Sequence, residues 1–164
     1  MLNNTLKSKL KNIKCIFLDF DGVFTDNHVY VNEDGTESVR CNRSDGIGIE
    51  LLKKKKFLIY IISSEKNKVV SERAKKLKIN CFRNVTDKGK KISELLKRNK
   101  LKKEDSLFLG NDINDLEAFK EVNIKVAVND CHPSLDKIVN FKTKKNGGNG
   151  AVRELCDIMY SIKK

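Results

Sequence analysis

Carboxylate, hydroxyl and ammonium side chains follow the short apolar runs of this sequence and could together handle a phosphoryl group. Asp19 and Asp21 come directly after one such run, and Ser63 follows a second. Lys88 begins an amphipathic stretch, and residues 110–115 follow a third run. Ligands of open parallel sheets bind beyond the carboxyl ends of the strands. We therefore expect these residues to meet at one edge of a sheet.

The spacing of Asp19 and Asp21 points to a divalent cation. Side chains at i and i+2 of an extended chain point to the same side, and two close carboxylates do not both ionise cheaply unless a cation joins them. Mg²⁺ takes oxygen ligands and also binds substrate phosphate oxygens. Lys88 would add a positive charge and Ser63 a hydrogen bond to a phosphoryl group. This combination is typical of phosphoryl transfer, in which positioning and charge stabilisation supply most of the catalysis.

Each of these features also has a structural interpretation. Residues 19–22 could be half of an EF-hand loop, but an apolar run precedes them instead of a helix, and no Glu stands at the twelfth position. A single Asp at the end of a strand often caps a helix, and Lys88 taken alone would be a surface lysine. Their joint occurrence, in this order after successive runs, favours the catalytic interpretation.

The elements that must position these residues alternate between apolar runs and amphipathic stretches. Apolar runs at 15–18, 57–62, 107–109 and 126–128 suit strands that are covered on both faces. Helical periodicity occurs at 69–77, 92–96 and 152–159. This alternation predicts an α/β fold, with a Rossmann-like parallel sheet and helices on both faces.

A β-hairpin is expected to interrupt this alternation directly after the first strand, at about residues 27–41. Residues 29–31 and 37–40 flank Asp34-Gly35, a typical turn signal. The 164 residues predict a single domain, 1–164. The intervals between the motifs leave no room for a separate cap domain, so the hairpin is the segment we expect to cover the site.

The charge of the chain raises nucleic acid as a possible partner. The formal net charge is +12, from 34 Lys and Arg against 22 Asp and Glu, and basic proteins often bind nucleic acid. The positive residues here are mostly lysines spread along the chain, without interleaved aromatic residues. A solvated basic surface is therefore favoured over a nucleic-acid interface.

We do not expect a membrane protein, a secreted protein or a zinc-finger protein. The longest apolar run, 57–62, is far shorter than the roughly 20 residues of a membrane helix, and the N-terminal segment has no pattern of a signal peptide. The five cysteines are scattered, without a C-x-x-C pair. They fit reduced thiols better than disulfides or a zinc site. We expect a cytoplasmic protein with no membrane partner.

At these residues the chain resembles the haloacid dehalogenase superfamily of phosphatases. The resemblance implies that Asp19 is the nucleophile that forms an aspartyl-phosphate and that Asp21 is the general acid and base. It implies that Ser63 and Lys88 hold the transferring phosphoryl group. It also implies that Asp19, the backbone carbonyl of Asp21 and a side chain from residues 110–115 hold Mg²⁺.

The fourth motif departs from the pattern of many relatives. Where they have the metal-binding Asp directly after the glycine, this chain has Asn111, followed by Asp112. Either Asn111 coordinates through its amide oxygen or Asp112 takes over. A carboxylate is the better Mg²⁺ ligand, so we expect Asp112, with Asp115 contacting the metal ligands from behind.

A narrower resemblance covers nearly the whole chain. DFDGVFTD, the hairpin, SDGIGIELL, GNDINDLEAF and GGNGAVRELCDIM are similar to segments of the capless phosphatases of 3-deoxy-D-manno-octulosonate 8-phosphate and of nine-carbon, sialic-type nonulosonate 9-phosphates. That family implies a homotetramer joined through its hairpins, with a neighbouring subunit helping to close each site. Gly147, Gly148 and Gly150, beside Arg153, resemble its C-terminal loop, which approaches a site.

The second motif indicates which sugar acid phosphate is the substrate. Octulosonate enzymes usually carry Thr-Gly-Arg there, whereas this chain has Ser63-Ser64-Glu65. Glu65 together with Lys76 looks more like the nine-carbon branch, although Glu65 could simply be a carboxylate at a helix N-terminus. We therefore expect a nonulosonate 9-phosphate, such as that of KDN or N-acetylneuraminate, as substrate, contacted by Ser64, Glu65, Lys76 and Arg153.

Two alternatives stay open. The substrate could instead be 3-deoxy-D-manno-octulosonate 8-phosphate. In a different class, the chain could be a non-catalytic oligomerisation domain that accompanies an acylneuraminate cytidylyltransferase. The presence of Asp19, Asp21, Ser63 and Lys88 argues against the non-catalytic alternative, and Asn111 is its only support.

Overall fold

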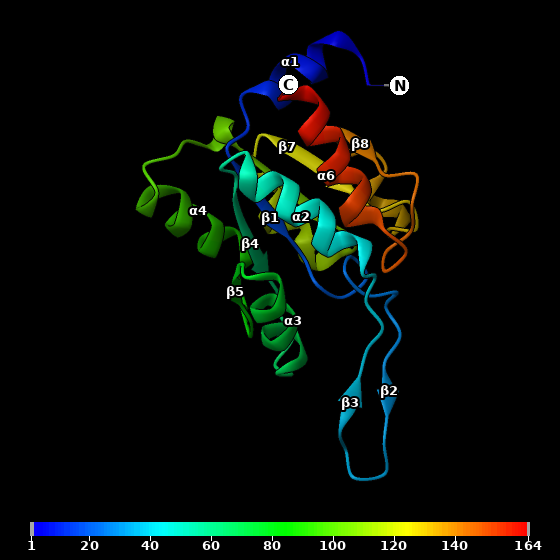
Figure 1. Cartoon of the computed structure of the whole chain (residues 1–164). Helices are drawn as coiled ribbons and strands as arrows, with labels where there is room; N and C mark the ends of the chain where they lie inside the picture. Colours follow the sequence, from blue (N-terminus) through cyan, green and yellow to red (C-terminus); the bar gives the residue numbers. More distant parts are fainter. Residues whose placement is uncertain (1, 164) are drawn as a thin grey trace.

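The computed structural model describes residues 2–163 and contains a six-stranded parallel sheet with helices on both faces (Figure 1). All five strand pairings in this sheet are parallel. In spatial order the strands are β5 (Asn80–Phe82), β4 (Leu58–Ile62), β1 (Cys15–Leu18), β6 (Ser106–Gly110), β7 (Ile124–Ala127) and β8 (Phe141–Lys142).

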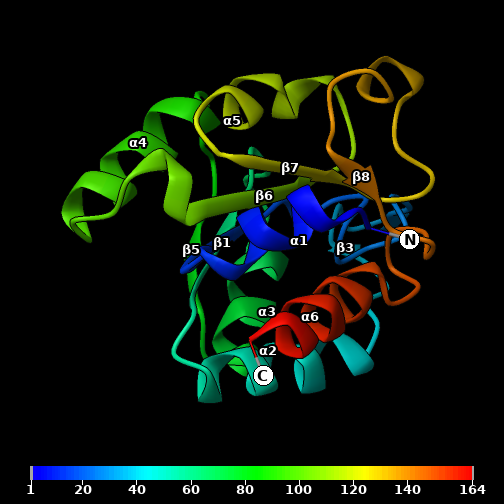
Figure 2. The ribbon, with the colours of Figure 1, turned by 90° about the horizontal axis from the view of Figure 1, so that it is seen from above.

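Five of the six α-helices within residues 2–163 divide between the two faces of the sheet. Figure 2 shows α2, α3 and α6 on one face and α4 and α5 on the other. Their bounds, with those of the N-terminal helix, are α1 (Asn4–Lys11), α2 (Ser44–Lys54), α3 (Val69–Leu77), α4 (Lys88–Arg98), α5 (Leu116–Lys120) and α6 (Ala151–Ile162). The α/β fold class predicted from the sequence is therefore confirmed.

The central strands are apolar at nearly every position because both of their faces are covered. Every residue of β1 and of β6 is buried. Phe17 and Phe108 are partners in register on these two strands and have no exposed surface. Burying one such side chain stabilises a fold by roughly 1.5–3 kcal/mol. This rigid centre holds the strand ends, and the residues that follow them, in place.

Several elements were not predicted from the sequence, among them β5, β8 and α1. The edge strands β5 and β8 are only three and two residues long, too short for a periodic pattern. Helix α1 is mostly polar and buries Leu10 alone, and its first turn is capped by the side chain of Asn3, which accepts a hydrogen bond from Leu6 N at 2.8 Å. Such elements depend on tertiary contacts and caps instead of on a long apolar face.

The hairpin predicted after β1 is present and projects away from the body of the molecule (Figure 1). Its strands β2 (Tyr30–Val31) and β3 (Glu37–Ser38) pair antiparallel. At the turn the Asp34 side chain accepts a hydrogen bond from Thr36 N, and Gly35 takes a φ of +78°, a conformation that glycine adopts at no steric cost. Val29, Tyr30 and Val31 are exposed by 50, 61 and 65 %.

A buried carboxylate joins α2 to α6. Asp45, in the first turn of α2, is fully buried and accepts a hydrogen bond from Arg153 N in the first turn of α6 at 3.0 Å. Burial raises the pKa of Asp45 to about 6, and the Arg153 N–H and the Arg73 charge act in the opposite direction. This contact fixes where α6 begins, and therefore where the preceding glycine-containing loop lies.

Two further observations concern the described part of the chain. No helix within residues 2–163 is long and apolar enough to cross a bilayer. All five cysteines are unpaired.

Candidate active site

The carboxyl ends of β1, β4 and β6 meet at one edge of the sheet and bring the expected residues together. Strand β1 lies between β4 and β6, with Leu18 in register with Ile61 and Leu109. Asp19, Ser63 and Asn111 are the residues that follow these strand ends. A sheet with a buried centre thus places three polar side chains side by side.

The centre of the site is one ammonium between two carboxylates. Lys88 Nζ lies 2.7 Å from Asp19 Oδ1 and 2.7 Å from Asp115 Oδ1. All three residues are buried, with 3, 3 and 0 % of their surfaces exposed for Lys88, Asp19 and Asp115. Lys88 stands at the first residue of α4, whose N-terminus is capped by the Asp87 side chain through Lys90 N. Burial lowers the pKa of Lys88, but the two carboxylates outweigh it and raise that pKa above its ordinary value.

Two carboxylates share one cation here, so a negative charge is left over. Burial, followed by repulsion from Asp115, raises the pKa of Asp19 to about 7 in spite of the Lys88 contact. A buried charge in excess is costly unless a further cation offsets it. The site therefore has the charge that a divalent cation requires.

A cluster of oxygen-bearing groups lies next to Asp19. The side-chain amide of Asn111 approaches the backbone carbonyl of Asp21 at 3.0 Å and Asp19 Oδ2 at 3.3 Å. With its NH₂ turned to this side, Asn111 donates hydrogen bonds to both oxygens. With the amide oxygen of Asn111 turned to this side, it faces the Asp21 carbonyl oxygen and Asp19 Oδ2. Three oxygens that face one another suit a hard cation. The residues present thus fit a magnesium ion.

Asn111, and not the expected Asp112, is the residue beside Asp19 and Asp21. Because β6 pairs in register with β1, the segment that follows β6 lies beside the segment that follows β1. Asp112 instead accepts a hydrogen bond from Ile113 N at 2.7 Å and caps the short 3₁₀ helix Ile113–Asp115. Within residues 2–163 no three His, Cys, Asp or Glu side chains are gathered to hold a metal ion, so any such site is a mixed one that includes amide and backbone oxygens.

Asp115 shapes the turn that carries Asn111. Its Oδ2 accepts hydrogen bonds from Asn111 N at 2.8 Å and Asp112 N at 3.3 Å. A Cβ at Gly110 would lie 2.3 Å from the same oxygen, so only glycine fits at the end of β6. Asp115 therefore contacts both Lys88 and the backbone of Asn111.

Asp21 lines a hollow of about 350 Å³ between the hairpin and the β4–α3 connection. The hollow is lined by Asp21, Asn27, His28, Val29, Glu37, Val39, Ser64, Glu65, Asn67 and Val69. Burial, with repulsion from Glu65 and Glu37, raises the pKa of Asp21, and Lys88 opposes this. A carboxyl with a raised pKa beside an open hollow is suited to exchange protons with a bound molecule.

Ser63 and Ser64 occupy the end of β4 as expected, but the Glu65 side chain is directed at its own loop. Ser63 is 1 % exposed, and its Oγ accepts a hydrogen bond from Glu65 N at 3.0 Å. Glu65 Oε1 accepts from Lys66 N and Asn67 N. This matches the structural interpretation of Glu65 as a carboxylate near a helix N-terminus, although the residue does line the hollow.

Lys76 and Arg153 do not reach this hollow within the chain. Lys76 lines a separate groove of about 770 Å³ between α2 and α3. Arg153 lines another hollow, and its Nε donates to both carboxylate oxygens of Asp157, one turn further along α6. Neither residue therefore lines the hollow beside Asp21.

Thr25 is a structural residue of the site that the sequence reasoning missed. It is fully buried, and its Oγ1 accepts hydrogen bonds from Gly22 N at 3.1 Å and Asn27 N at 3.3 Å. These bonds hold the turn after Asp21. A threonine in a turn rich in Gly and Asp is a typical backbone-bonding residue, and this was the available signal.

The fold and the site together define a class of enzyme, a metal-assisted hydrolase with a carboxylate held by an ammonium at the strand ends. Comparison with known proteins agrees. The family described as haloacid dehalogenase-like hydrolase matches residues 49–155. The 3-deoxy-D-manno-octulosonate 8-phosphate phosphatase KdsC of Escherichia coli K12 is 33% identical over 153 residues, which covers 93% of this chain and 81% of the relative.

Solved structures of relatives share the whole fold. The 3-deoxy-D-manno-octulosonate 8-phosphate phosphatase of Yersinia pestis superposes with a TM-score of 0.94 at 31% identity, covering 98% of this chain and 87% of that one. The Moraxella catarrhalis enzyme, in complex with magnesium, phosphate and KDO, gives 0.93 at 30% identity, covering 98% and 92%. The chain belongs to the haloacid dehalogenase-like hydrolase family. It is a phosphoric monoester hydrolase, and Mg²⁺ is its cofactor.

Replacing Lys88 by methionine should destabilise the protein, because two buried carboxylates would lose their shared cation. Breaking a buried ion pair from one side costs about 3–5 kcal/mol, so we expect a decrease of this order in the free energy of unfolding, measured with urea. The matched control is Lys120→Met, which removes the exposed pair with Glu117 and should leave stability near that of the wild type. Equal stability of Lys88→Met and the wild type would contradict the assigned geometry.

Proposed function

We propose that this enzyme hydrolyses the phosphate ester of a 3-deoxy-ulosonic acid, with 3-deoxy-D-manno-octulosonate 8-phosphate as the favoured substrate. The observation that carries this proposal is the Lys88–Asp19–Asp115 arrangement at the strand ends. It occurs in a chain whose relatives of similar length are named for that substrate. The non-catalytic alternative loses support, because the chain belongs to a family of hydrolases and Lys88 pairs with Asp19.

The nonulosonate 9-phosphate expectation is kept as a second candidate. Its support is the second motif, Ser63-Ser64-Glu65, in place of the usual Thr-Gly-Arg. Its weakness is that Glu65 bonds to its own loop and Lys76 lies in a separate groove. The eight-carbon substrate therefore has the stronger support.

In the proposed mechanism Asp19 attacks the phosphorus. One carboxylate oxygen of Asp19 forms a bond to phosphorus while the bond between phosphorus and the sugar oxygen breaks. Asp21 donates its proton to the leaving sugar alkoxide. Asp21, now ionised, then takes a proton from water, whose oxygen attacks the phosphorus of the aspartyl-phosphate. Inorganic phosphate leaves, and Asp19 and protonated Asp21 are regenerated.

The residues around Asp19 hold the charges of this reaction in place. Lys88 and the Ser63 hydroxyl would bind oxygens of the transferring phosphoryl group, and Asp115 keeps Lys88 aimed at Asp19. Asp19, the Asp21 carbonyl and Asn111 would hold Mg²⁺, with Asp112 capping the turn. The cation supplies positive charge against the phosphoryl oxygens, as in other phosphoryl transfers.

We also propose that the enzyme works as a homotetramer in the cytoplasm. The hollow beside Asp21 is open, and the hairpin that lines one side of it exposes Val29, Tyr30 and Val31. Exposed apolar side chains on a projecting hairpin support assembly through this segment. The unpaired cysteines support a reducing compartment.

The assembly is tested by light scattering at micromolar concentration. The wild type should have the mass of a tetramer, and Tyr30→Lys/Val31→Lys should dissociate because charges would replace the apolar contact. The variant Lys97→Glu, on the exposed side of α4, is the matched control and should stay a tetramer. A monomeric wild type would refute the proposal.

The activity is tested by phosphate release from octulosonate 8-phosphate and nonulosonate 9-phosphate, measured side by side. We expect a higher kcat/KM for the eight-carbon ester, and a loss of several orders of magnitude in Asp19→Asn because the amide is not a nucleophile. Asp112→Asn should retain most of the activity, since an amide oxygen can still cap the turn. The proposal fails if neither ester is hydrolysed, or if Asp19→Asn is as active as the wild type.

A further inference from the structure

The loop that precedes α6 packs directly on the turn that follows β1. We name residues 144–150 the glycine loop and residues 19–26 the β1 turn. Gly148 N donates a hydrogen bond to Val23 O at 3.1 Å. On its other side the loop is bonded to the body of the protein, with Gly147 N donating to Asp130 Oδ1 at 2.9 Å. The role of this contact is not explained by the mechanism above.

The contact is between two backbones and leaves no room for a side chain. A Cβ at Gly147 would lie 1.9 Å from the backbone oxygen of Gly22 and 2.6 Å from its carbonyl carbon. A Cβ at Gly148 would lie 2.3 Å from Asp26 N, and Gly148 also has a φ of +66°. Backbone atoms on a tight turn cannot move aside as the end of a flexible side chain can. The fit of the glycine loop therefore determines the position of the β1 turn.

The part of the turn that is touched is next to Asp21. Gly22 follows Asp21 directly, so a shift of Gly22 rotates the peptide that contains the Asp21 carbonyl. That carbonyl is the one that the Asn111 amide approaches at 3.0 Å. Thr25 Oγ1 couples Gly22 to the rest of the turn. A displacement at Gly22 thus reaches both the oxygen cluster and the carboxyl group of Asp21.

The glycine loop is held rigidly enough to act as a support. The backbone N–H groups of Lys144 and Lys145 donate to the Glu154 carboxylate on α6 at 2.9 Å each. Asn129 Nδ2 donates to Asn146 Oδ1 at 2.8 Å, which joins the loop to the segment after β7.

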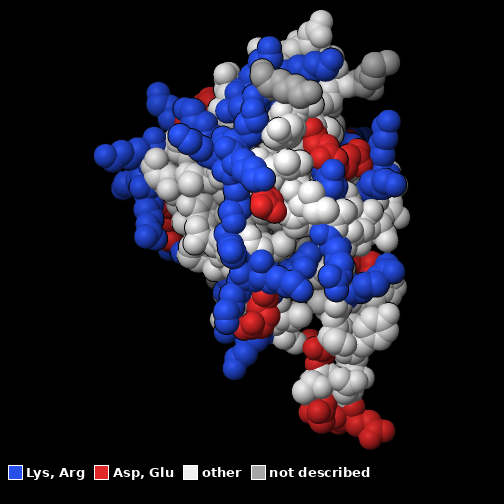
Figure 3. All heavy atoms as spheres, viewed as in Figure 1, with Lys and Arg blue, Asp and Glu red and all other residues white. Residues whose placement is uncertain are grey.

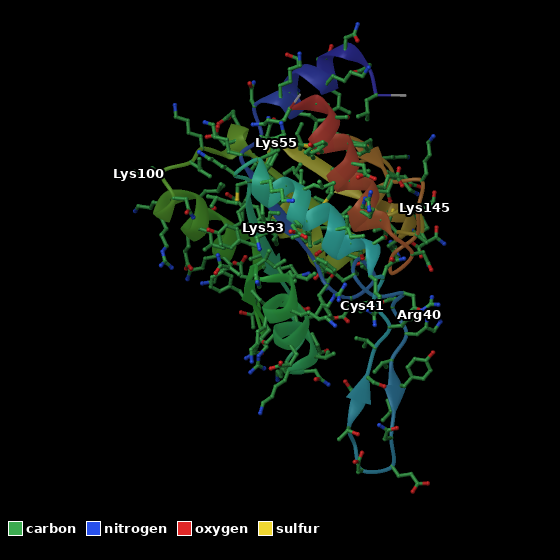
Figure 4. The ribbon with its side chains drawn as sticks, in the orientation of Figure 1. Arg40, Cys41, Lys53, Lys55, Lys100 and Lys145 are labelled. Atoms are coloured by element: carbon green, nitrogen blue, oxygen red, sulfur yellow. The ribbon has the colours of Figure 1, made fainter. Side chains whose placement is uncertain are left out.

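The loop also reaches the base of the hairpin. Arg40 pairs with Asp26 of the β1 turn at 2.8 Å, and its Nη2 donates to Asn149 Oδ1 at 3.4 Å. Figure 4 labels Arg40 at the base of the hairpin and Lys145 on the loop beside α6. The β1 turn is therefore contacted both by the glycine loop and by the base of the hairpin.

We infer that Gly147 and Gly148 are positioning residues, whose close backbone contact fixes Asp21 and its carbonyl for the reaction. This inference rests on the proposed role of Asp21, but not on the identity of the sugar. Because it concerns geometry at the carbonyl as well as at the carboxyl group, it predicts a change in Mg²⁺ affinity together with a change in kcat.

The experiment compares Gly147→Ala with Gly150→Ala. Gly147 has no left-handed φ, so its substitution adds only a clash with the β1 turn, at Gly22 and at Thr25 O, which is 3.1 Å away. Gly150 has a φ of +95°, with its nearest atoms at 3.6 and 3.8 Å, so its substitution adds only backbone strain. The assay uses p-nitrophenyl phosphate, and calorimetry with MgCl₂ alone gives the Kd of the metal.

We expect Gly147→Ala to lower kcat by roughly tenfold or more and to weaken Mg²⁺ binding, with a smaller effect on KM. Gly150→Ala should lower the Tm while kcat and the Mg²⁺ Kd stay within about twofold of the wild type. The inference is overturned if folded Gly147→Ala has the kcat and Mg²⁺ Kd of the wild type, or if both variants lose kcat in proportion to stability.

A second pair of variants decides the matter if Gly147→Ala does not fold. Asp130→Ala removes the acceptor of Gly147 N without adding bulk, whereas Asp130→Asn keeps an acceptor oxygen in place. We expect Asp130→Ala to lower kcat and weaken Mg²⁺ binding, and Asp130→Asn to restore both. Equal values for the two variants would overturn the inference. A wild type that cleaves p-nitrophenyl phosphate but neither sugar phosphate would refute the proposed substrate class and leave this result standing.

Discussion

One buried ammonium between two buried carboxylates is the constraint on which the rest of the structure depends. Lys88 must come from a helix on one face of the sheet and reach Asp19 at the end of β1. It can do so because α4 begins close to α5: a Cβ at Gly89 would lie 2.7 Å from the backbone oxygen of Glu117. Gly110 allows Asp115 to approach in the same way. The glycines at these two positions are therefore requirements of the charge arrangement.

The site carries excess negative charge although the protein as a whole is basic. Figure 3 shows Lys and Arg over much of the visible face of the body and Asp and Glu at the tip of the hairpin. The side chains that face the hollow include Asp21, Glu37 and Glu65. A bound Mg²⁺ offsets part of this charge, and the +12 of the whole chain attracts an anionic sugar phosphate over a longer range. The basic surface is thus compatible with the encounter of an anionic substrate.

Elements with a regular pattern of apolar residues could be predicted from the sequence. The positions of residues that depend on contacts between distant segments could not. The four central strands and the hairpin followed from apolar runs and from Asp34-Gly35. The preference for Asp112 as a ligand came from ligand chemistry alone. The structure places Asn111 beside Asp19 because of the register between β1 and β6. The close approach of Gly147 to Gly22 joins residues far apart in the chain, and no local pattern carries that information.

The central claim is that Asp19 is the group that becomes phosphorylated. It is tested by quenching the enzyme in acid during turnover with substrate and Mg²⁺, reducing it with borohydride, and locating the product by peptide mass spectrometry. An aspartyl-phosphate is reduced to homoserine, so the account predicts homoserine at position 19 in the wild type and none in Asp19→Asn. Homoserine at position 21 or 115, or at no position during active turnover, would contradict it.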